Sequence, residues 1–468
     1  MTSHAASPAT PGTRRMPHAL VMMLLIITAA VALTYVVPSG AFERTKVGLV
    51  VPGTYHVIPK HLTATLITPK KSTDSLAYAA APISIVTSIP AGMVKAAALI
   101  MMILFVGGMF GILDETGALT TGIDHLVHST KGNVGIVVPA IMIAIACGST
   151  FLGLISEYLV LIPMMVLLAE RLGYNALFGV AIVTIAAKIG YLTSVTNPLA
   201  LVVAQPLVGV PVFSGAGFRA VLFVLFLPLG IWYLLRRAPS MRTGEGAGSH
   251  ESSSRLSARH IGILIALLAA VAAMIAGVRY ADWGNPELSS MFVLLSLLLA
   301  VIGGLGTRPA AQAFLKGMQG MLLAAVLVGL ASAVEIVLKD ALVLDSIING
   351  LASAIEGKHP AIVSQLMMGI QLVIDVLIPS TSGKAAVTMP ILGPIGQLAG
   401  VSGQVIVQAF LFGNGLMNTV TPTSGMLLAY LAAGKVNYGD WVKFILPLFG
   451  ILLALCAGAL FVLTVFLS

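Results

Sequence analysis

Residues 444–467 have the sequence FILPLFGILLALCAGALFVLTVFL, which contains no charged side chain. A run of about 18 or more apolar residues is typical of a membrane-spanning helix, because a helix satisfies its backbone hydrogen bonds internally within lipid. Similar runs recur upstream, at residues 19–37, 97–113, 220–235, 261–278 and 292–305. The chain is 58% hydrophobic and only 9% charged, whereas a soluble domain carries about 25% charged residues. The sequence therefore predicts an all-α polytopic membrane protein.

The net charge of +8 does not indicate a nucleic-acid partner, because the basic residues are not clustered. They lie in the N-terminal tail, in a central polar segment and in short loops. An excess of Lys and Arg in short loops is typical of the cytoplasmic side of a membrane protein. We therefore expect the lipid bilayer as the partner, with the chain in the inner (plasma) membrane, and no nucleic acid.

Patterns that would indicate an enzyme or a metal protein are missing from the apolar segments. Neither HExxH nor GxSxG occurs, and no pair of catalytic aspartates is apparent. The two cysteines, Cys147 and Cys456, lie far apart without ligand-type neighbours, which argues against a disulfide or a zinc site. We predict no enzymatic activity, no metal and no cofactor.

Two polar stretches divide the chain. Residues 1–16 are predicted as a cytoplasmic tail, and residues 17–237 as the first membrane half with an extracytoplasmic segment at 38–95. Within that segment, residues 76–95 fit no clear category. The Gly- and Ser-rich residues 238–259 are predicted as a flexible cytoplasmic linker. Residues 260–468 form the second membrane half.

The two halves carry related landmarks at nearly constant spacing. Pro163 and Pro390 differ by 227 positions, and the pairs Gly173/Gly400 and Lys131/Lys358 have the same separation. The segment TSVTNP ending at Pro198 corresponds to MNTVTP ending at Pro422, at a separation of 224. The order of these landmarks favours an internal duplication.

Polar breaks interrupt four apolar stretches at matching places. Residues 192–198 and 417–422 place Ser, Thr, Asn and Pro inside apolar spans, and proline opens a helix there. Residues 147–150 and 378–383 interrupt the stretches 134–171 and 361–398 in the same way. Non-helical backbone at membrane depth is tolerated where it is buried in protein or lines a wet cavity. We predict two broken helices and two re-entrant hairpins.

A count of the membrane crossings supports this organisation. With the N-terminus inside, spans at 17–37, 96–113, 176–206 and 217–236 return the chain to the cytoplasm at Arg236 and Arg237. Spans at 260–278, 289–306, 318–338, 403–434 and 441–466 complete about nine transmembrane helices, and the two hairpins then enter from opposite sides. This is an inverted repeat, which is typical of secondary transporters. Amphipathic stretches at 115–130 and 340–356 precede the hairpins and are predicted to lie at the interface.

Several longer segments resemble the anaerobic C4-dicarboxylate carrier family, in the branch of basic amino acid antiporters, within the ion transporter superfamily. The resemblance covers nearly the whole chain and rests on LTYVVPSGAFER (33–44), VPGTY (51–55), GGMFG (107–111), the residues from Asn197 to Gln205, VPVFSG (210–215), 379–390 and 412–425. It implies an antiporter or symporter of carboxylate-bearing solutes, with the site at the hairpin tips and broken helices.

The chain also departs from the pattern expected of that family. A paired-glutamate motif appears as Ser156-Glu157, and Lys188 stands where a small residue is expected. Near the second hairpin and the last break, the chain has Asp375, Lys384 and Asn414 where Asn, Gln and Asp are expected. These changes bear on both the substrate and the coupling ion.

Ionisable groups within the membrane cost about 3 kcal/mol or more, so each is a candidate functional residue. Lys188, Asp375, Lys384 and Asn414 are predicted to bind a coupling ion or to compensate charge. The alternative is that Asp375–Lys384 and Glu157–Lys188 are structural ion pairs. Hydroxyl, amide and carboxylate groups beside the four breaks are predicted to bind the substrate: Ser149, Thr150, Ser156, Glu157, Asn197, Ser380, Thr381, Ser382, Asn418, Thr421 and Thr423.

The sequence thus favours a secondary active transporter of a small carboxylate-bearing solute, such as a C4-dicarboxylate or an amino acid. Protons or an exchanged solute are favoured over sodium as the coupling partner, because a lysine at the second tip would replace a bound cation. A passive channel or facilitator for organic anions is the alternative, although a channel requires a continuous polar lining. A homodimer remains open.

Overall fold

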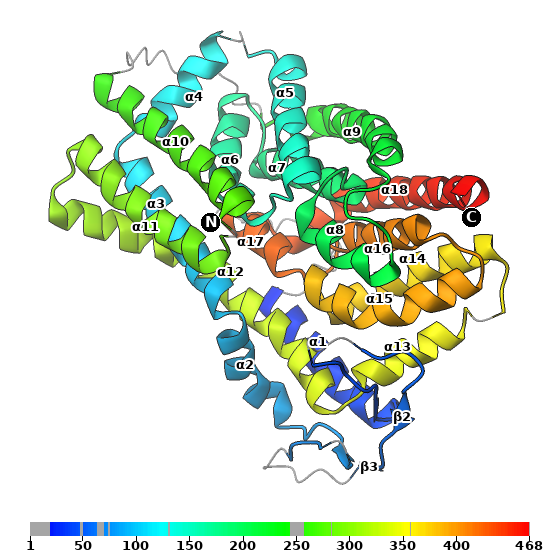
Figure 1. The fold of residues 1–468 in the computed structure, drawn as a ribbon. Helices are drawn as coiled ribbons and strands as arrows, with labels where there is room; N and C mark the ends of the chain where they lie inside the picture. Colours follow the sequence, from blue (N-terminus) through cyan, green and yellow to red (C-terminus); the bar gives the residue numbers. More distant parts are fainter. Residues whose placement is uncertain are drawn as a thin grey trace, which may run out of the picture.

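The computed structural model describes residues 19–46, 50–62, 70–73, 75–129, 132–243, 257–281, 283–355 and 357–467. The predicted cytoplasmic tail (1–16) and most of the predicted linker (244–256) lie outside the described residues. The ends of the linker region belong to neighbouring elements: Met241 accepts a hydrogen bond from the Asn175 amide at 3.0 Å. The described chain is mostly helical (Figure 1).

Helices alternate with short breaks through the first half of the chain. Asparagine side chains cap three of them, since Asn133 accepts from the Gly135 amide, Asn175 from the Phe178 amide and Asn197 from the Leu199 amide. The elements are α1 (Ala19–Val36), α2 (Ser84–Lys95), α3 (Ala97–Glu115), α4 (Ala118–Ser129), α5 (Val134–Cys147), the π-helical turn η1 (Gly148–Leu152), the 3₁₀ turn η2 (Ser156–Val160), α6 (Leu161–Arg171), α7 (Ala176–Thr193), α8 (Pro198–Ala204), the 3₁₀ turn η3 (Pro206–Val208), α9 (Ala216–Arg237) and the 3₁₀ turn η4 (Ala238–Met241).

The second half repeats much of this order. Its elements are α10 (Ala258–Tyr280), α11 (Asn285–Gly303), α12 (Thr307–Asp340), α13 (Leu344–Ser353), α14 (Pro360–Leu377), α15 (Thr381–Leu398), α16 (Gly403–Met417), α17 (Gly425–Ala433) and α18 (Tyr438–Leu467). The short helices α4 and α13 coincide with the two predicted amphipathic stretches. After each of them the chain has a helix pair, a broken helix and a long helix. The inverted relation of the two halves stays a prediction.

The segment after α1 forms two small sheets. Strand β1 (Gly40–Ala41) pairs antiparallel with β2 (His56–Val57), and β3 (Lys60–His61) pairs in parallel with β4 (Ala77–Tyr78). Arg44 forms an ion pair with Asp345 of α13 at 2.9 Å, which fastens the segment to the second half. Residues 84–95, which the sequence left unclassified, form α2 against α12, where Lys95 pairs with Glu335 at 2.5 Å.

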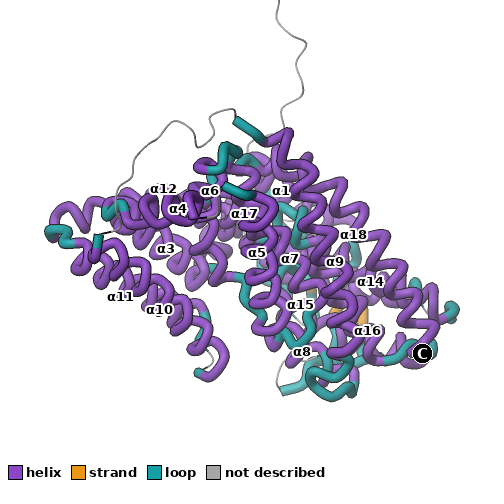
Figure 2. Tube along the Cα trace, turned by 90° about the horizontal axis from the view of Figure 1, so that it is seen from above, coloured by secondary structure: helices purple, strands orange, loops and turns teal. Residues whose placement is uncertain are grey.

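The helices gather into two groups. Helices α3, α10 and α11 lie on one side of the molecule, and α14, α16 and α18 on the other (Figures 1 and 2). The long helix α12 packs against α1, α2, α3 and α17. The two backbones of α12 and α3 are in contact at Gly317, where a Cβ atom would lie 2.1 Å from the Gly107 carbonyl oxygen. Small residues at such crossings let membrane helices approach closely.

Nine helical segments within the described residues are long and apolar enough to cross a membrane. This number agrees with the predicted count of about nine, and the all-α membrane fold is confirmed. The candidate spans are not all the same segments as the predicted spans, however. It includes α5 and α14, which we predict as hairpin arms, whereas the predicted spans at 260–278 and 403–434 contribute the shorter apolar helices Ala258–Met274 and Gly403–Met417.

Candidate functional site

A buried ion pair lies where α14 ends and α15 begins. Asp375 is in the last turn of α14 and Lys384 in the first turn of α15, separated only by the break at residues 378–380. Because these two helices lie side by side (Figure 1), the Lys384 ammonium reaches Asp375 Oδ1 at 2.7 Å. Both side chains are fully buried. The predicted Asp375–Lys384 pair is therefore present.

Two further oxygen atoms surround the Lys384 ammonium. Lys384 Nζ donates to Asn414 Oδ1 at 3.1 Å and lies 3.4 Å from the Gln371 carbonyl oxygen. The Phe410 ring adds a cation–π contact at 5.4 Å from the ring centroid. The ammonium thus has three oxygen neighbours from α14 and α16. Such an oxygen-rich setting is the kind that a hard cation prefers.

The second oxygen of Asp375 connects this pair to the break between α16 and α17. Asn418 Nδ2 donates to Asp375 Oδ2 at 2.9 Å, and Asn418 Oδ1 accepts from the Ser424 hydroxyl at 2.7 Å. The side chains of Asn418 and Ser424 thus hydrogen-bond to each other across the break at residues 418–424. The predicted residues Asp375, Lys384, Asn414 and Asn418 therefore form one network.

The first half joins this network through Tyr191 of α7. Asn414 Nδ2 donates to the Tyr191 hydroxyl and to Thr381 Oγ1, the latter at 3.0 Å. The Tyr191 hydroxyl donates in turn to Thr381 Oγ1 at 3.2 Å. Nearby, Gln408 Nε2 of α16 donates to the Leu192 carbonyl oxygen at 3.2 Å. The last turns of α7 thus contact the second hairpin and the second broken helix.

The first predicted tip also contacts α7. The Ser149 hydroxyl donates to the Ala187 carbonyl oxygen at 2.8 Å. Thr150 Oγ1 lies 3.0 Å from Thr193 Oγ1 and accepts from the Val195 amide at 3.0 Å. Both hydroxyl groups are fully buried and are used within the protein. We infer that in this conformation they hold the first tip against α7.

Glu157 lies apart from the Lys384 network. Its carboxylate accepts from the Ile155 amide at 2.9 Å within the turn η2, beside the predicted residue Ser156. The alternative of a Glu157–Lys188 ion pair is wrong for the described residues, whose four ion pairs do not include it. The reason is the extent of the first break. It runs from Gly148 to Val160, well beyond the predicted tip at 147–150.

The remaining predicted residues have local partners or face outward. Asn197 caps α8 and donates to the Ser194 hydroxyl at 3.2 Å. Thr421 and Thr423 contact each other through their hydroxyl groups at 2.7 Å. Ser380 caps α15, and both Ser380 and Ser382 are exposed. These residues lie at the predicted breaks without entering the Lys384 network.

Sequence reasoning missed several residues of the buried polar region. Tyr191 and Gln371 belong to the network described above. Arg219 of α9 is fully buried and donates to Gln404 Oε1 at 2.9 Å and to Gln408 Oε1 at 3.3 Å. A detectable signal existed for Arg219, because it is a charged residue beside the apolar run 220–235.

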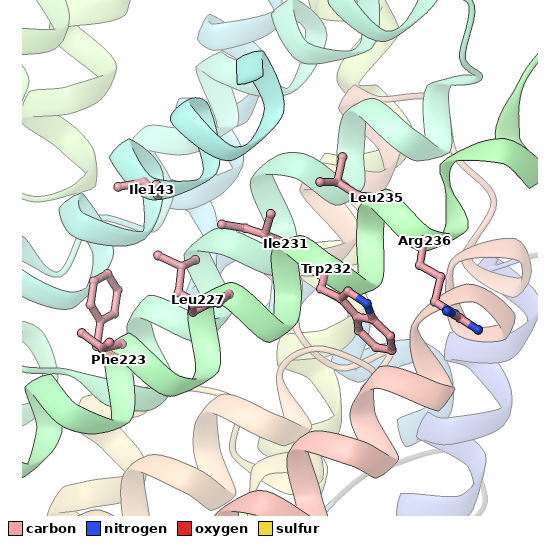
Figure 3. Close-up of a pocket in the computed structure, with 9 residues that line it drawn as sticks. Ile143, Phe223, Leu227, Ile231, Trp232, Leu235 and Arg236 are labelled. Carbon is pink, nitrogen blue, oxygen red and sulfur yellow. The ribbon is translucent and has the colours of Figure 1, made fainter. Parts of the chain in front are cut away.

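A groove on α9 lies away from this region. It measures about 660 Å³ and follows α9 from Phe223 to Arg236, with Ile143 of α5 on its other side (Figure 3). Its walls are apolar, and Val224 and Trp232 are half-exposed or more. We interpret it as a surface that faces lipid.

The nine candidate spans of the described residues and the buried charge network at the helix breaks are what a multi-pass membrane transporter of small solutes would have. The family model for the C4-dicarboxylate anaerobic carrier, DcuC, matches residues 16–465. The chain belongs to this family, as the resemblance predicted.

Relatives match along nearly the whole length. A protein of Escherichia coli K12 with the provisional name basic amino acid antiporter YfcC is 32% identical, covering 94% of this chain and 95% of its own. An uncharacterised protein of Haemophilus influenzae Rd is 26% identical over the same shares of the two chains. The family and the relative named as an antiporter confirm that the chain is a secondary transporter.

Two solved structures are similar over nearly the full chain. The YdaH transporter of Alcanivorax borkumensis has a TM-score of 0.44 at 17% identity, covering 97% of this chain and 99% of its own. MtrF of Neisseria gonorrhoeae, described among antimetabolite efflux pumps, has a TM-score of 0.43 at 18% identity, covering 97% and 96%. We draw no conclusion from these two similarities.

Proposed function

We propose that the chain transports a small carboxylate-bearing solute, such as a C4-dicarboxylate or an amino acid, across the inner membrane by alternating access. In this proposal transport is coupled to protons or to an exchanged solute and does not require sodium. The observation that carries it is the Lys384 ammonium, surrounded by the oxygen atoms of Asp375, Asn414 and Gln371.

The argument rests on the chemistry of that position. Three oxygen atoms around one positive charge are the surroundings that a bound metal cation would take. The Lys384 ammonium is part of the protein, so the positive charge at this position does not depend on a cation bound from solution. Asp375 is already paired at 2.7 Å, which leaves it little attraction for a second cation. A carrier with this arrangement has a permanent substitute for a coupling ion.

The substrate is proposed to bind beside this network, at the start of α15. The Ser380 side chain caps this helix by accepting from the Gly383 amide at 3.3 Å, and the exposed Ser382 hydroxyl lies in its first turn. The N-terminus of a helix carries partial positive charge, which attracts a carboxylate. Thr381 connects the same turn to Tyr191 and Asn414, so substrate binding there would affect the contacts of α7.

The first prediction concerns sodium. Uptake by wild-type protein in proteoliposomes should be unchanged when sodium is replaced by potassium, because Lys384 occupies the cation position. In Lys384→Gln the oxygen atoms of Asp375 and Asn414 lose their cation, and any remaining uptake should require sodium. Uptake is measured with sodium, with a proton gradient and with neither. A steep sodium requirement in the wild type would falsify the proposed coupling.

The second prediction concerns Ser382. Ser382→Ala should weaken the apparent affinity for the transported solute by about three- to tenfold, the loss expected for one hydrogen bond, without lowering thermal stability. Asn197→Ala should lower stability instead, because it removes the cap of α8. Ser290→Ala, at an exposed serine of α11, is the matched control. Unchanged affinity in Ser382→Ala would place the substrate elsewhere.

A passive channel is the alternative function. Counterflow distinguishes the two, since a carrier accelerates uptake when the same solute is present on the other side, whereas a channel does not. The same proteoliposomes serve for this measurement. We favour the carrier because the polar groups beside the four breaks are engaged within the protein or at single helix ends, which does not make a continuous polar lining.

A further inference from the structure

Lys188 is a buried cation with no direct partner among the described residues. It lies on α7, the residue is only 5% exposed, and the four ion pairs of the described chain involve other residues. Asp375 influences Lys188 electrostatically, but its carboxylate pairs with Lys384. A buried charge without a paired counter-charge is strongly unfavourable. Lys188 therefore requires a stabilising partner that the ion pairs of the described residues do not supply.

Thr184 lies one turn before Lys188 on the same face of α7. Its hydroxyl oxygen is fully buried and has no hydrogen-bond partner among the described residues. Helical threonines usually donate to a carbonyl of the preceding turn. Thr193, Thr388 and Thr464 do so in this protein. The Thr184 hydroxyl is an exception, and a buried hydroxyl without a partner is costly.

Both side chains line one cavity between α7 and α18. The other walls are apolar side chains of these two helices together with Trp441 and Thr419. The cavity leaves about 10 Å³ for the centre of a water-sized particle. This is about the smallest space that holds one water molecule, so a monatomic anion, which is somewhat larger, fits when the apolar side chains around it move slightly outward. Two unsatisfied polar groups thus meet in a space for a single particle.

The chemistry of the walls favours an anion. An ammonium group has donors only, and the Thr184 hydroxyl is free to donate. The Thr419 carbonyl oxygen already accepts from the Trp441 indole at 2.9 Å, while the Thr419 hydroxyl donates to Leu416 at 2.6 Å. A water molecule could accept from the Lys188 ammonium and donate to the Thr184 oxygen, but it would leave the positive charge of Lys188 without a counter-charge. A cation would be repelled by Lys188.

We propose that this cavity binds one monatomic anion of the halide class, held by the Lys188 ammonium and the Thr184 hydroxyl. The site is separate from the proposed carboxylate site at α15. Thr419 follows Asn418, which donates to Asp375 at 2.9 Å, so an anion here stabilises the break that bounds the charge network. The anion compensates Lys188 in the way that Asp375 compensates Lys384.

The test is thermal unfolding of the purified full-length protein in detergent, which requires no knowledge of the transported solute. Sodium gluconate is replaced stepwise by sodium chloride or bromide at constant ionic strength. Both halides should raise the unfolding temperature of the wild type along a saturable curve. The effect should be lost in Lys188→Met. In Thr184→Val the half-saturating concentration should increase about tenfold, as expected for one lost hydrogen bond to a charged group.

Controls separate specific binding from a general salt effect. Lys443→Met, at an exposed lysine of α18, should keep the wild-type halide response. Acetate should have no effect, because it is larger than the cavity. An equal response in Lys188→Met, or an equal effect of acetate, would overturn the proposal. If Lys188→Met does not fold, Thr184→Val decides the question, since an unchanged half-saturating concentration also contradicts the site.

Discussion

Removing one partner of the buried charge pair should be far more damaging than removing both charges. Lys384→Gln leaves Asp375 as an unpaired buried carboxylate, which is expected to cost about 3–5 kcal/mol of stability. In the double variant Asp375→Asn with Lys384→Gln, two neutral amides can hydrogen-bond to each other and to Asn414 and Asn418. We expect most of the lost stability to return, because no unpaired charge remains buried and the two amides can satisfy each other's hydrogen bonds.

Transport should not return with stability in the double variant. If the pair carries the coupling charge, a neutral amide pair folds but does not support coupled uptake. Thermal unfolding in detergent and uptake in proteoliposomes are measured on the same preparations. Full recovery of uptake in the double variant would show that the pair is only a structural ion pair, the alternative that the sequence left open.

The second large effect is expected at the crossing of α3 and α12. Gly317→Ala places a Cβ atom 2.1 Å from the Gly107 carbonyl oxygen, and Gly111→Ala places one 2.0 Å from the Ala313 carbonyl oxygen. Both contacts are with backbone, so no side chain can move aside and the two helices must separate. Overpacking costs about 1–3 kcal/mol in ordinary cores and sometimes more. We expect each variant to reach at least the upper end of that range.

Gly320→Ala on the same helix is the matched control, because no atom other than those of its chain neighbours and of the α12 backbone lies within 4 Å of the position of its Cβ. It should leave the unfolding temperature unchanged or slightly raised, since alanine is the better helix former. Similar losses at Gly317 and Gly320 would mean that the damage comes from α12 itself and not from its contact with α3.

The sequence predicted the membrane fold and the positions of the helix breaks well. Uncharged runs such as 444–467 define spans, and prolines at 198 and 422 with their Ser, Thr and Asn neighbours define where helices open. Asp375 and Lys384 were predicted together because they flank one short break. Asp375 and Lys384 are nine positions apart, and only three residues separate their helices. The two side chains therefore lie at the same turn of the chain and within contact distance.

Contacts that depend on the rotation of a helix could not be predicted in this way. Helix α7 is buried on nearly all sides, so its hydrophobic pattern does not indicate which face meets which neighbour. Lys188 and Tyr191 are only three residues apart, yet one lines the cavity beside α18 and the other contacts Asn414. The Glu157–Lys188 pairing failed for the same reason, together with the unexpected length of the first break.

The two predicted hairpin tips differ in how their serine and threonine side chains are held. Ser149 and Thr150 are buried and bonded to α7, whereas Ser380 and Ser382 are exposed at the start of α15. Displacing the first tip would break several dry hydrogen bonds at once, but the serines of the second tip can exchange partners with water at small cost. We therefore expect Ser380 and Ser382 to rearrange more readily than Ser149 and Thr150, while Thr381 and Lys384 hold the rest of the second tip to Asn414.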